Sequence, residues 1–438
     1  DKDHIKIYAC GPTVYNFAHI GNARMAVVFD TFVRTLRVIY PKVTYVSNIT
    51  DIDDKIIDAA KEQNVEISEI TEKYTQIYND DMSMLNVLEP DIQPKATEYI
   101  PEMIALIEDL IAKEFAYEKD NHVLFHVPAY SKYGELSNRN REEQIAGSRV
   151  EIAPFKKDPS DFVLWKPSDD SQPGWDSPWG FGRPGWHTEC SAMSEKTLGL
   201  PFDIHGGGRD LIFPHHENEI AQSCCSTANI DEPDSYAKYW MHNGFVTIEG
   251  EKMSKSLGNI ILVRDLTNNY HGEAIRLALL SSHYRQGLDW NEKIIYQAKK
   301  LLTKIYQILD ELKDIQEIES ESLNIEPITT LMDDLNTPGL IAQLNQIAKE
   351  YNTNKNIDKK KIKSKLLFIG SVLGIFEDKA FNKISDDLKE KVEVLINDRD
   401  IAKSQKNFEL ADKIRDELNE LGIEIKDTSD GTSWNIKS

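Results

Sequence analysis

The sequence is poor in cysteine and has no long apolar run. Its 438 residues include only four cysteines, which excludes the disulfide framework typical of small secreted domains. Cys224 and Cys225 are adjacent and cannot share one helix face, so we predict that they fill the core. No segment approaches the roughly 18 apolar residues of a membrane-spanning helix, and the polar first residues do not resemble a secretion signal. We therefore expect a reduced, cytoplasmic protein without a membrane partner.

Positive charge is also scarce. Lysine and arginine number 51 against 73 acidic residues, which gives a net charge of −22. This imbalance excludes a general affinity of the surface for nucleic acid, so any RNA would have to bind local basic patches. The most basic stretch, residues 351–370, holds six lysines and one acid. The length predicts about three domains, and 40% hydrophobic residues is a soluble, globular composition.

The first fifty residues have the pattern of an α/β fold. A short apolar strand at 5–9 is followed by a helix that begins at Gly21, and 43–49 is typical of a second strand. A strand-helix-strand unit favours a parallel sheet with a right-handed crossover. Ligands of such sheets bind at the carboxyl ends of the strands, where Cys10 and Thr50 lie.

Later segments differ in composition and in predicted secondary structure. Residues 115–127 predict a hairpin, and the Gly-, Pro- and Trp-rich segment 173–186 is expected to be irregular. The α/β pattern then resumes with a strand at 202–204, a glycine loop at 206–208 and a helix from Pro214. After about residue 291 the pattern is almost purely helical, with one apolar stripe formed by Ile294, Ala298, Leu301, Ile305, Leu309 and Leu312.

Two motifs indicate phosphate chemistry. The segment from Cys10 to Asn22 runs from a strand end through a Gly-Pro turn to His19 at a helix start, where free backbone N–H groups would face an anion. A capped helix with a chance histidine is the alternative. Residues 250–259 hold two lysines in a flexible loop that could neutralise charge on a pyrophosphate leaving group. A solvated lysine turn is the alternative there.

Together the two motifs resemble the HIGH and KMSKS signatures of class I aminoacyl-tRNA synthetases. Residues 252–256 match the second signature letter for letter, and the first is present as His19-Ile20-Gly21-Asn22, with Asn replacing the final His. Within that class the chain resembles cysteinyl-tRNA synthetase. The segments that carry this resemblance are 8–15, 48–54, 185–191, 203–208, 213–219, 333–338 and 431–434.

The resemblance implies an α/β architecture with a Rossmann-type parallel-sheet catalytic domain and an inserted connecting domain, followed by an all-α bundle and a small C-terminal domain. It also implies a monomer. We expect the following division: catalytic halves at 1–114 and 186–246, the insertion at 115–185, the KMSKS-loop and stem-contact region at 247–290, the bundle at 291–395 and an anticodon-binding domain at 396–438.

Four residues form a candidate metal site. His215 and Glu219 are four apart on one helix face, and with Cys10 and Cys190 they offer donors that suit zinc. Spacing alone does not distinguish His215 from His216 as the ligand. The alternative to a metal site is that the cysteines fill the core and the His-Glu face is exposed to solvent. The resemblance selects His215 and implies one Zn²⁺ per chain.

A metal would explain how cysteine is selected. Cysteine and serine differ by one atom, and discrimination of about 10⁴–10⁵ requires about 5–7 kcal/mol. A zinc–thiolate bond could supply this difference, because a serine hydroxyl stays protonated and binds zinc poorly. With four protein ligands, the substrate sulfur would be the fifth. The resemblance places Thr50 and Asp210 at the cysteine amino group and Trp186 beside its side chain.

The implied activity is ATP-dependent activation of L-cysteine to cysteinyl-adenylate and transfer to the 3′ end of tRNA(Cys). His19, Asn22, Lys252 and Lys255 would be catalytic, Gly11 and Gly21 would help to bind ATP, and Mg²⁺ would accompany it. Two alternatives are a ligase that attaches cysteine to an amino sugar and a catalytically silent zinc protein that binds RNA. We expect tRNA recognition in the last third, where basic or stacking side chains are Lys403, Lys406, Lys413, Arg415 and Trp434.

Overall fold

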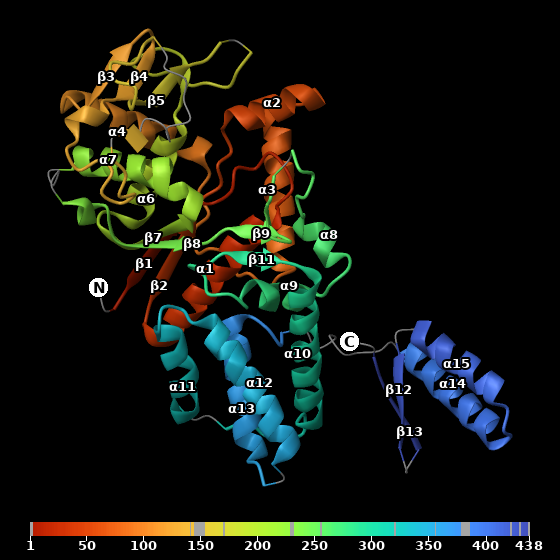
Figure 1. Ribbon diagram of the computed structural model, residues 1–438. Helices are drawn as coiled ribbons and strands as arrows, with labels where there is room; N and C mark the ends of the chain where they lie inside the picture. Colours follow the sequence, from red (N-terminus) through yellow and green to blue (C-terminus); the bar gives the residue numbers. More distant parts are fainter. Residues whose placement is uncertain are drawn as a thin grey trace.

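The computed structural model describes most of the chain. The described residues are 3–140, 142–143, 154–169, 171–227, 232–254, 256–318, 321–354, 356–377, 386–420, 423–428 and 431–436. Figure 1 shows an α/β body with an inserted sheet at one end, a helical bundle at the other and a separate C-terminal unit. No helix in this part of the chain is both long and apolar enough to cross a membrane.

A parallel four-stranded sheet forms the centre of the α/β body. Its order is β2-β1-β7-β8, with β1 at Ile5–Ala9, β2 at Val43–Ser47, β7 at Phe202–Gly208 and β8 at Ala237–Asn243. The helix α1, Ile20–Ile39, joins β1 to β2 and buries its apolar side in the main core. The predicted α/β class with a parallel sheet is confirmed.

The glycine loop predicted at 206–208 is wrong, because these residues complete β7. Gly206 pairs with Ala9 on one side and Met241 on the other. A Cβ atom on Gly206 would lie 2.1 Å from Cζ of Phe29 in α1. The role of this glycine is therefore to let α1 pack closely on the sheet. It does not form a turn of the chain.

The inserted domain contains an antiparallel sheet in the order β3-β4-β5-β6. The predicted hairpin is confirmed, with β3 at Ala116–Lys119 and β4 at His122–Phe125. The expectation that 173–186 is irregular is wrong at Gly182–Pro184, which forms β6 and pairs with β5, Phe162–Pro167. A Cβ on Gly182 would lie 2.4 Å from the carbonyl oxygen of Lys166, so only glycine permits this pairing.

Several helices surround these two sheets. They are α2 at Asp54–Gln63, α3 at Ile67–Ser83, α4 at Ile100–Ala112, α6 at Trp186–Leu198, and α7 at Glu217–Ser226, which follows a wide turn at Ile212–His216. A second small sheet contains β9 at Val246–Ile248, β10 at Glu251–Lys252 and β11 at Leu288–Trp290, with α8 at Val263–Thr267 and α9 at Gly272–Leu279 beside it. Short turns of 3₁₀ helix lie at Ala96–Tyr99, Val127–Ala129, Arg209–Leu211 and Pro233–Ser235.

The helical bundle shares the main core with α1. It comprises α10 at Glu292–Glu311, α11 at Glu321–Met332, α12 at Thr337–Thr353 and α13 at Lys359–Leu373. The predicted apolar stripe faces this core, with Ile294 and Leu309 only partly buried. Bundle and catalytic domain are therefore held together by continuous apolar packing.

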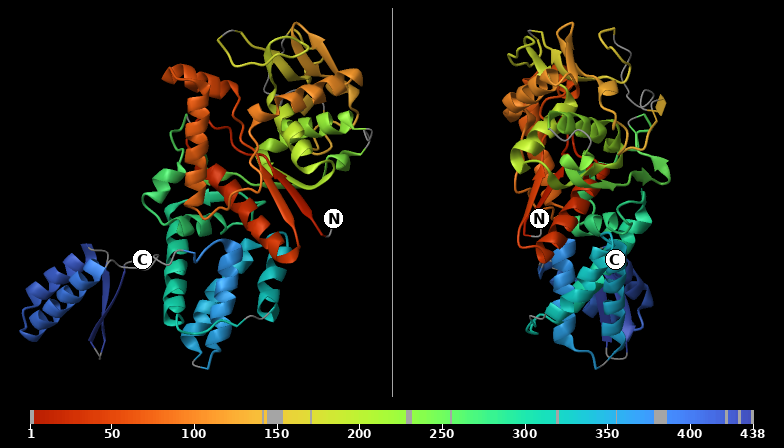
Figure 2. Two further views of the ribbon diagram at one scale, coloured as in Figure 1. Left: turned by 180° about the vertical axis from the view of Figure 1, so that it is seen from behind. Right: turned by 90° about the vertical axis from the view of Figure 1, so that its left-hand side faces the viewer.

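The C-terminal unit is not purely helical. The helices α14, Asp386–Ser404, and α15, Phe408–Glu420, pack on each other, and a hairpin of β12, Ile423–Thr428, and β13, Gly431–Ile436, follows. The domain boundary expected after residue 395 falls within α14. Figures 1 and 2 show this unit on the side of the bundle where α10 lies.

Candidate active site

The predicted site residues gather at the carboxyl ends of the parallel strands. Cys10 and Gly11 follow β1, Thr50 follows β2, and Asp210 follows β7. Gly11 crosses closely over the chain after β2, since a Cβ there would lie 1.6 Å from the backbone oxygen of Asn48. Parallel α/β sheets form their ligand sites at this edge.

The four candidate metal ligands are brought together and buried. The Sγ atoms of Cys10 and Cys190 are 3.8 Å apart, and the Cys10 Sγ lies 3.6 Å from Oε1 of Glu219. The Nε2 atom of His215 lies 3.1 Å from the same Oε1. Cys10 follows β1, Cys190 lies in α6 and Glu219 lies in α7, so three separate parts of the chain supply one cluster.

These distances fit a tetrahedral zinc ion. Bonds of about 2.3 Å to sulfur and about 2.0–2.1 Å to nitrogen and oxygen place two sulfurs about 3.8 Å apart, a sulfur and an oxygen about 3.6 Å, and a nitrogen and an oxygen about 3.3 Å. The observed separations of 3.8, 3.6 and 3.1 Å are close to these values. The group Cys10, Cys190, His215 and Glu219 could therefore hold a metal with little rearrangement.

A second combination in the same cluster fits less well. Cys10 and Glu219 also lie near His205 and His216. However, Nε2 of His205 is only 2.7 Å from Oε2 of Glu219, which is the length of a hydrogen bond and too short for two ligands of one zinc ion. The Tyr236 hydroxyl donates to the same Oε2 at 2.7 Å. His205 and Tyr236 thus hold one oxygen of Glu219 while the other faces the thiols.

The electrostatics of the cluster favour charged ligands. Burial alone would raise the pKa of Glu219, but the positive charge of His205 and His215, with hydrogen bonds from His205 and Tyr236, lowers it to about 2. The hydrogen bond from Cys10 lowers the pKa of Cys190 to about 6, whereas burial raises the pKa of the Cys10 thiol. A thiolate and a carboxylate at neutral pH are the states that bind a divalent metal.

His19 caps α1 with its own side chain. Its Nδ1 accepts hydrogen bonds from the backbone N–H groups of Gly21 and Asn22 at 3.1 and 3.2 Å, and Oδ1 of Asn22 accepts from the backbone N–H of His19 at 3.0 Å. The backbone N–H groups of Gly21 and Asn22 are therefore not among the free N–H groups predicted at this helix start. Burial lowers the pKa of His19, so its neutral ring carries the proton on Nε2. This N–H is the donor that remains for a ligand.

The start of α1 is joined through the backbone to the segment that follows the second signature motif. The N–H of Ile20 donates to the carbonyl of Ile261, and the N–H of Val263 donates to the carbonyl of Ala18, both at 2.9 Å. The guanidinium of Arg264 lies 4.4 Å from the ring centre of Phe17, which strengthens the junction.

Only one of the two signature lysines can be placed. Lys252 is exposed in β10, and its carbonyl accepts from the Asn259 side chain at 3.2 Å. Lys255 lies outside the described residues. Gly250 and Gly258, which flank this loop, have φ angles of +83° and +64°, a conformation that favours glycine.

The predicted cysteine-binding residues lie around the cluster. Trp186 is 39% exposed, and its ring stacks on His215 with centroids 4.2 Å apart. Thr50 is buried, and its Oγ1 accepts from Nδ2 of Asn48 at 3.3 Å. Asp210 is exposed. Burial lowers the pKa of His19, and the negative charge of Asp210 opposes that lowering. Burial also opposes the rise in the pKa of His215, to which Glu219, Cys190 and Asp210 contribute.

Sequence reasoning missed the side chains that support the site. His205 and Tyr236 bind Glu219, Asn48 joins Gly11 to Thr50, and Nδ1 of His216 lies 2.8 Å from Nε2 of His242. His205 and Asn48 fall within segments already noted for their resemblance to a family. Tyr236 and His242 carry no local signal that separates them from ordinary core residues.

The basic residues predicted to bind tRNA are largely engaged within the protein. Lys403 pairs with Asp427 at 3.1 Å, Lys413 with Glu409 at 3.1 Å and Arg415 with Asp412 at 3.2 Å. The side chain of Trp434 lies outside the described residues. Anticodon recognition by this unit therefore stays a prediction.

Comparison with known proteins decides the family. Residues 1–300 match the class I (C) catalytic domain of tRNA synthetases, 328–377 match the DALR domain, and 385–434 match the cysteinyl-tRNA ligase anticodon binding domain. The cysteine--tRNA ligase of Parvibaculum lavamentivorans is 53% identical over 100% of this chain and 94% of its own length. The chain belongs to the cysteine--tRNA ligase family.

Other relatives agree with this assignment. The cysteine--tRNA ligase of Rhodospirillum rubrum is 50% identical over 99% of this chain and 95% of its own length. Among solved structures, the Mycobacterium tuberculosis methionyl-tRNA synthetase with methionyl-adenylate has a TM-score of 0.61 at 14% identity, covering 85% of this chain and 89% of its own. The Thermus thermophilus arginyl-tRNA synthetase has a TM-score of 0.51 at 12% identity, covering 85% and 80%. These two structures are similar in fold alone.

Proposed function

We propose that the chain activates L-cysteine with ATP and transfers it to the 3′ end of tRNA(Cys), as a class I aminoacyl-tRNA synthetase. The observation that carries this proposal is the buried cluster of Cys10, Cys190, His215 and Glu219, in a chain that matches cysteine--tRNA ligases over its full length. The match of residues 385–434 to an anticodon binding domain favours tRNA over an amino sugar as the acceptor.

The four cluster residues would hold one Zn²⁺. When bound, zinc supplies a soft Lewis acid that prefers a thiolate to a hydroxyl, and thus cysteine to serine. Trp186 would form an apolar wall beside the substrate side chain, because its ring stacks on His215 and is still partly exposed. Thr50 and Asp210 would receive the ammonium group. Asp210 supplies the negative charge for that contact.

The nucleotide chemistry rests on positioning and charge. The cysteine carboxylate attacks the α-phosphate of ATP, the bond from that phosphorus to the bridging oxygen breaks, and pyrophosphate leaves. The Nε2–H of His19 would donate to a phosphate oxygen near Gly11, Gly21 and Asn22 at the start of α1. Lys252 and Lys255 would neutralise the pyrophosphate, with Mg²⁺ accompanying ATP. A terminal ribose hydroxyl of the tRNA then attacks the adenylate carbonyl and releases AMP. The monomeric state and the cytoplasmic location remain predictions.

Cysteine-dependent pyrophosphate exchange and charging of tRNA(Cys) test the activity, and the variant Cys190→Ser tests the metal. This variant should lose zinc and cysteine activation together, while Cys225→Ser, which changes a buried cysteine outside the cluster, should keep both. Exchange without tRNA charging would indicate a small-molecule ligase, and absence of exchange would indicate a silent RNA-binding protein. Normal discrimination against serine in zinc-free protein would show that the metal proposal is wrong.

A further inference from the structure

The proposed site has to make two distinctions, and a bound zinc ion would make only one of them. Zinc prefers a thiolate to a hydroxyl group, which separates cysteine from serine. It does not separate cysteine from small thiols that lack an ammonium group, because these offer the metal the same sulfur. Selection among thiols therefore depends on the protein groups that receive the ammonium group, and Thr50 is one of the two residues proposed for that contact.

Asn48 is a buried residue that holds the side chain of Thr50. It directly follows β2 and is 1% exposed. Its Oδ1 accepts from the backbone N–H of Gly11 at 2.9 Å, and its Nδ2 donates to Oγ1 of Thr50 at 3.3 Å. A backbone N–H can only donate, so the atom that faces Gly11 must be the oxygen and the atom that faces Thr50 must be the nitrogen. The position of Gly11 thus determines the direction of the hydrogen bond to Thr50.

The other contacts of Thr50 fix its backbone and the direction of its hydroxyl group. The backbone N–H donates to the carbonyl of Pro12 at 3.1 Å, and the carbonyl accepts from the N–H of Val14 at 3.2 Å. The hydroxyl group donates to the side chain of Glu189, which is 1% exposed in α6. A hydroxyl group has one proton and two lone pairs. Among the described residues its partners are Glu189 and Asn48, so one lone pair is left for a ligand.

A lone pair is the group that an ammonium ligand needs, because an ammonium group can only donate. A hydroxyl group that rotated freely would in some orientations present its proton to the ligand, and that proton would repel the ammonium group. The Nδ2–H of Asn48 excludes orientations in which the Thr50 proton points toward Asn48, and it keeps Oγ1 in one place. This contact is therefore ordered when the protein folds, before the ligand arrives.

We propose that Asn48 is a positioning residue that holds the hydroxyl group of Thr50 as an acceptor for the ammonium group of cysteine, and so favours an amino acid over other small thiols. The inference rests on the proposed function, since it takes cysteine as the substrate. Asn48 acts through Thr50 and has no contact of its own with the substrate. Its removal should therefore weaken binding only of thiols that carry an ammonium group.

The test compares the binding of two thiols by the zinc-loaded, full-length variant Asn48→Ala, measured by titration calorimetry. One thiol is cysteine, and the other is 3-mercaptopropionate, which has the thiol and the carboxylate of cysteine but no ammonium group. Loss of one oriented hydrogen bond should raise the Kd of cysteine about ten-fold, whereas the Kd of 3-mercaptopropionate should stay close to the wild-type value. A merely structural role of Asn48 would weaken the binding of both thiols equally.

A double-mutant cycle shows whether Asn48 acts through Thr50. Thr50→Val removes the hydroxyl group and nearly keeps the shape of the side chain. In that background, Asn48→Ala should cause no further loss of cysteine affinity, because there is no hydroxyl group to orient. Asn48→Leu has as many side-chain heavy atoms as asparagine and should reproduce the effect of Asn48→Ala. It replaces the alanine variant in both experiments if that variant does not fold.

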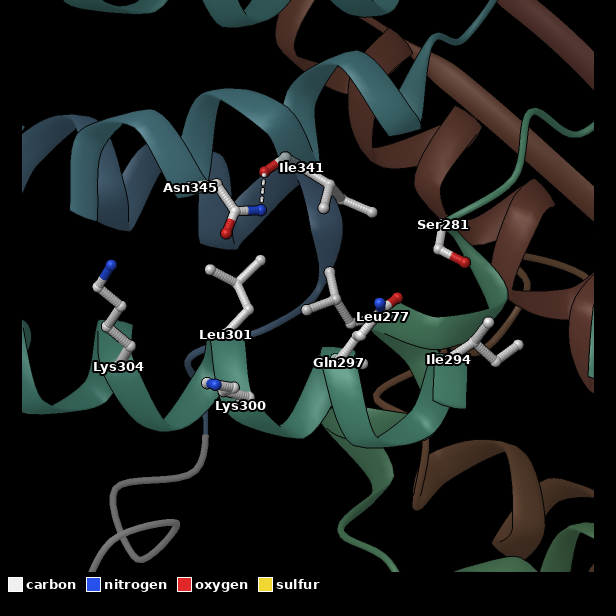
Figure 3. Close-up of a pocket in the computed structure, with 10 residues that line it drawn as sticks. Leu277, Ser281, Ile294, Gln297, Lys300, Leu301, Lys304, Ile341 and Asn345 are labelled. Carbon is white, nitrogen blue, oxygen red and sulfur yellow. Dashed lines mark hydrogen bonds between the residues drawn. The ribbon is translucent and has the colours of Figure 1, made fainter. Parts of the chain in front are cut away.

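Two control variants remove an asparagine amide that does not contact Thr50. Asn218→Ala changes a buried residue of α7 whose Oδ1 accepts from the hydroxyl group of Tyr133. Asn345→Ala changes a residue of α12 whose Nδ2 donates to the carbonyl of Ile341 at 3.2 Å, beside a groove between α10 and α12 (Figure 3). Both variants should keep the wild-type ratio of the two thiol affinities.

Three results would overturn the proposal. They are equal losses of affinity for both thiols, additive effects in the cycle, and loss of zinc from the Asn48 variants. Zinc content is informative because Sγ of Cys190 lies 3.8 Å from Oδ1 of Asn48, so zinc loss would show that Asn48 supports the metal cluster instead. Absence of cysteine-dependent pyrophosphate exchange in the unmodified chain would refute the proposed function, independently of these binding measurements.

Discussion

Tyr236→Phe is the sharpest test of how the site is supported. The change removes one hydroxyl, which donates to Oε2 of Glu219 at 2.7 Å in a fully buried environment. Glu219 is the only carboxylate among the four proposed ligands, and its low pKa depends in part on this hydrogen bond. The substitution leaves the ring, and therefore the packing against Phe202 and His205, in place.

The expected loss of zinc affinity in Tyr236→Phe follows from the contacts that Glu219 keeps. A hydrogen bond to a charged group contributes about 1.5–3 kcal/mol, and loss of a group that orients a metal ligand lowers metal affinity by about 10–100-fold. His205 still donates to the same oxygen at 2.7 Å, so Glu219 is not left without a partner. We therefore expect the lower part of the range, a zinc affinity about 10–30-fold weaker.

Zinc affinity can be measured by competition with a chromophoric chelator at fixed pH, together with the ratio of cysteine to serine activation. The control is Tyr8→Phe. Tyr8 lies in the same hydrophobic core as Tyr236, and its buried hydroxyl has no hydrogen-bond partner among the described residues. Thermal unfolding of both variants shows whether the fold is retained. Equal zinc affinities for the two folded variants would refute the supporting role of Tyr236.

Three further outcomes are expected. Lys255→Ala should slow adenylate formation by the equivalent of about 3–4 kcal/mol with little change in cysteine binding; an unchanged single-turnover rate would remove Lys255 from the mechanism. Gly206→Ala should lower the free energy of unfolding by about 1–3 kcal/mol, because the new methyl group meets Phe29, and an unchanged denaturation midpoint would contradict that packing. Deletion of residues 386–438, which removes α14 as a whole, should leave pyrophosphate exchange near normal and sharply reduce tRNA charging, whereas full charging by the truncated chain would exclude anticodon recognition by this unit.

Much of the local structure could be predicted from the residues alone. The strand-helix-strand unit around α1 and the apolar stripe of α10 are set by periodicity within short segments, which depends on neighbouring residues only. The two signature motifs were recognisable because their chemistry lies in consecutive residues. The candidate metal ligands needed a family resemblance as well, because spacing alone left His215 and His216 equivalent.

Other features depend on contacts between distant segments. Cys10 and Cys190 are 180 residues apart in sequence, and the tertiary fold brings their sulfurs to 3.8 Å from each other. Residues 206–208 have the composition of a loop, yet they lie in a strand because they pair with β8, and Gly206 also pairs with β1.

Which charges remain available for a ligand was also decided by the tertiary structure. His19 uses Nδ1 to cap α1, which leaves Nε2 as its donor. The ammonium group of Lys363 donates to the carbonyls of Lys313 and Ile315, which follow α10. The sequence determined the residue types and their local secondary structure, since these follow from near neighbours. The tertiary structure decided their partners, because a charge or hydrogen-bonding group is free for function only when no distant segment has already paired with it.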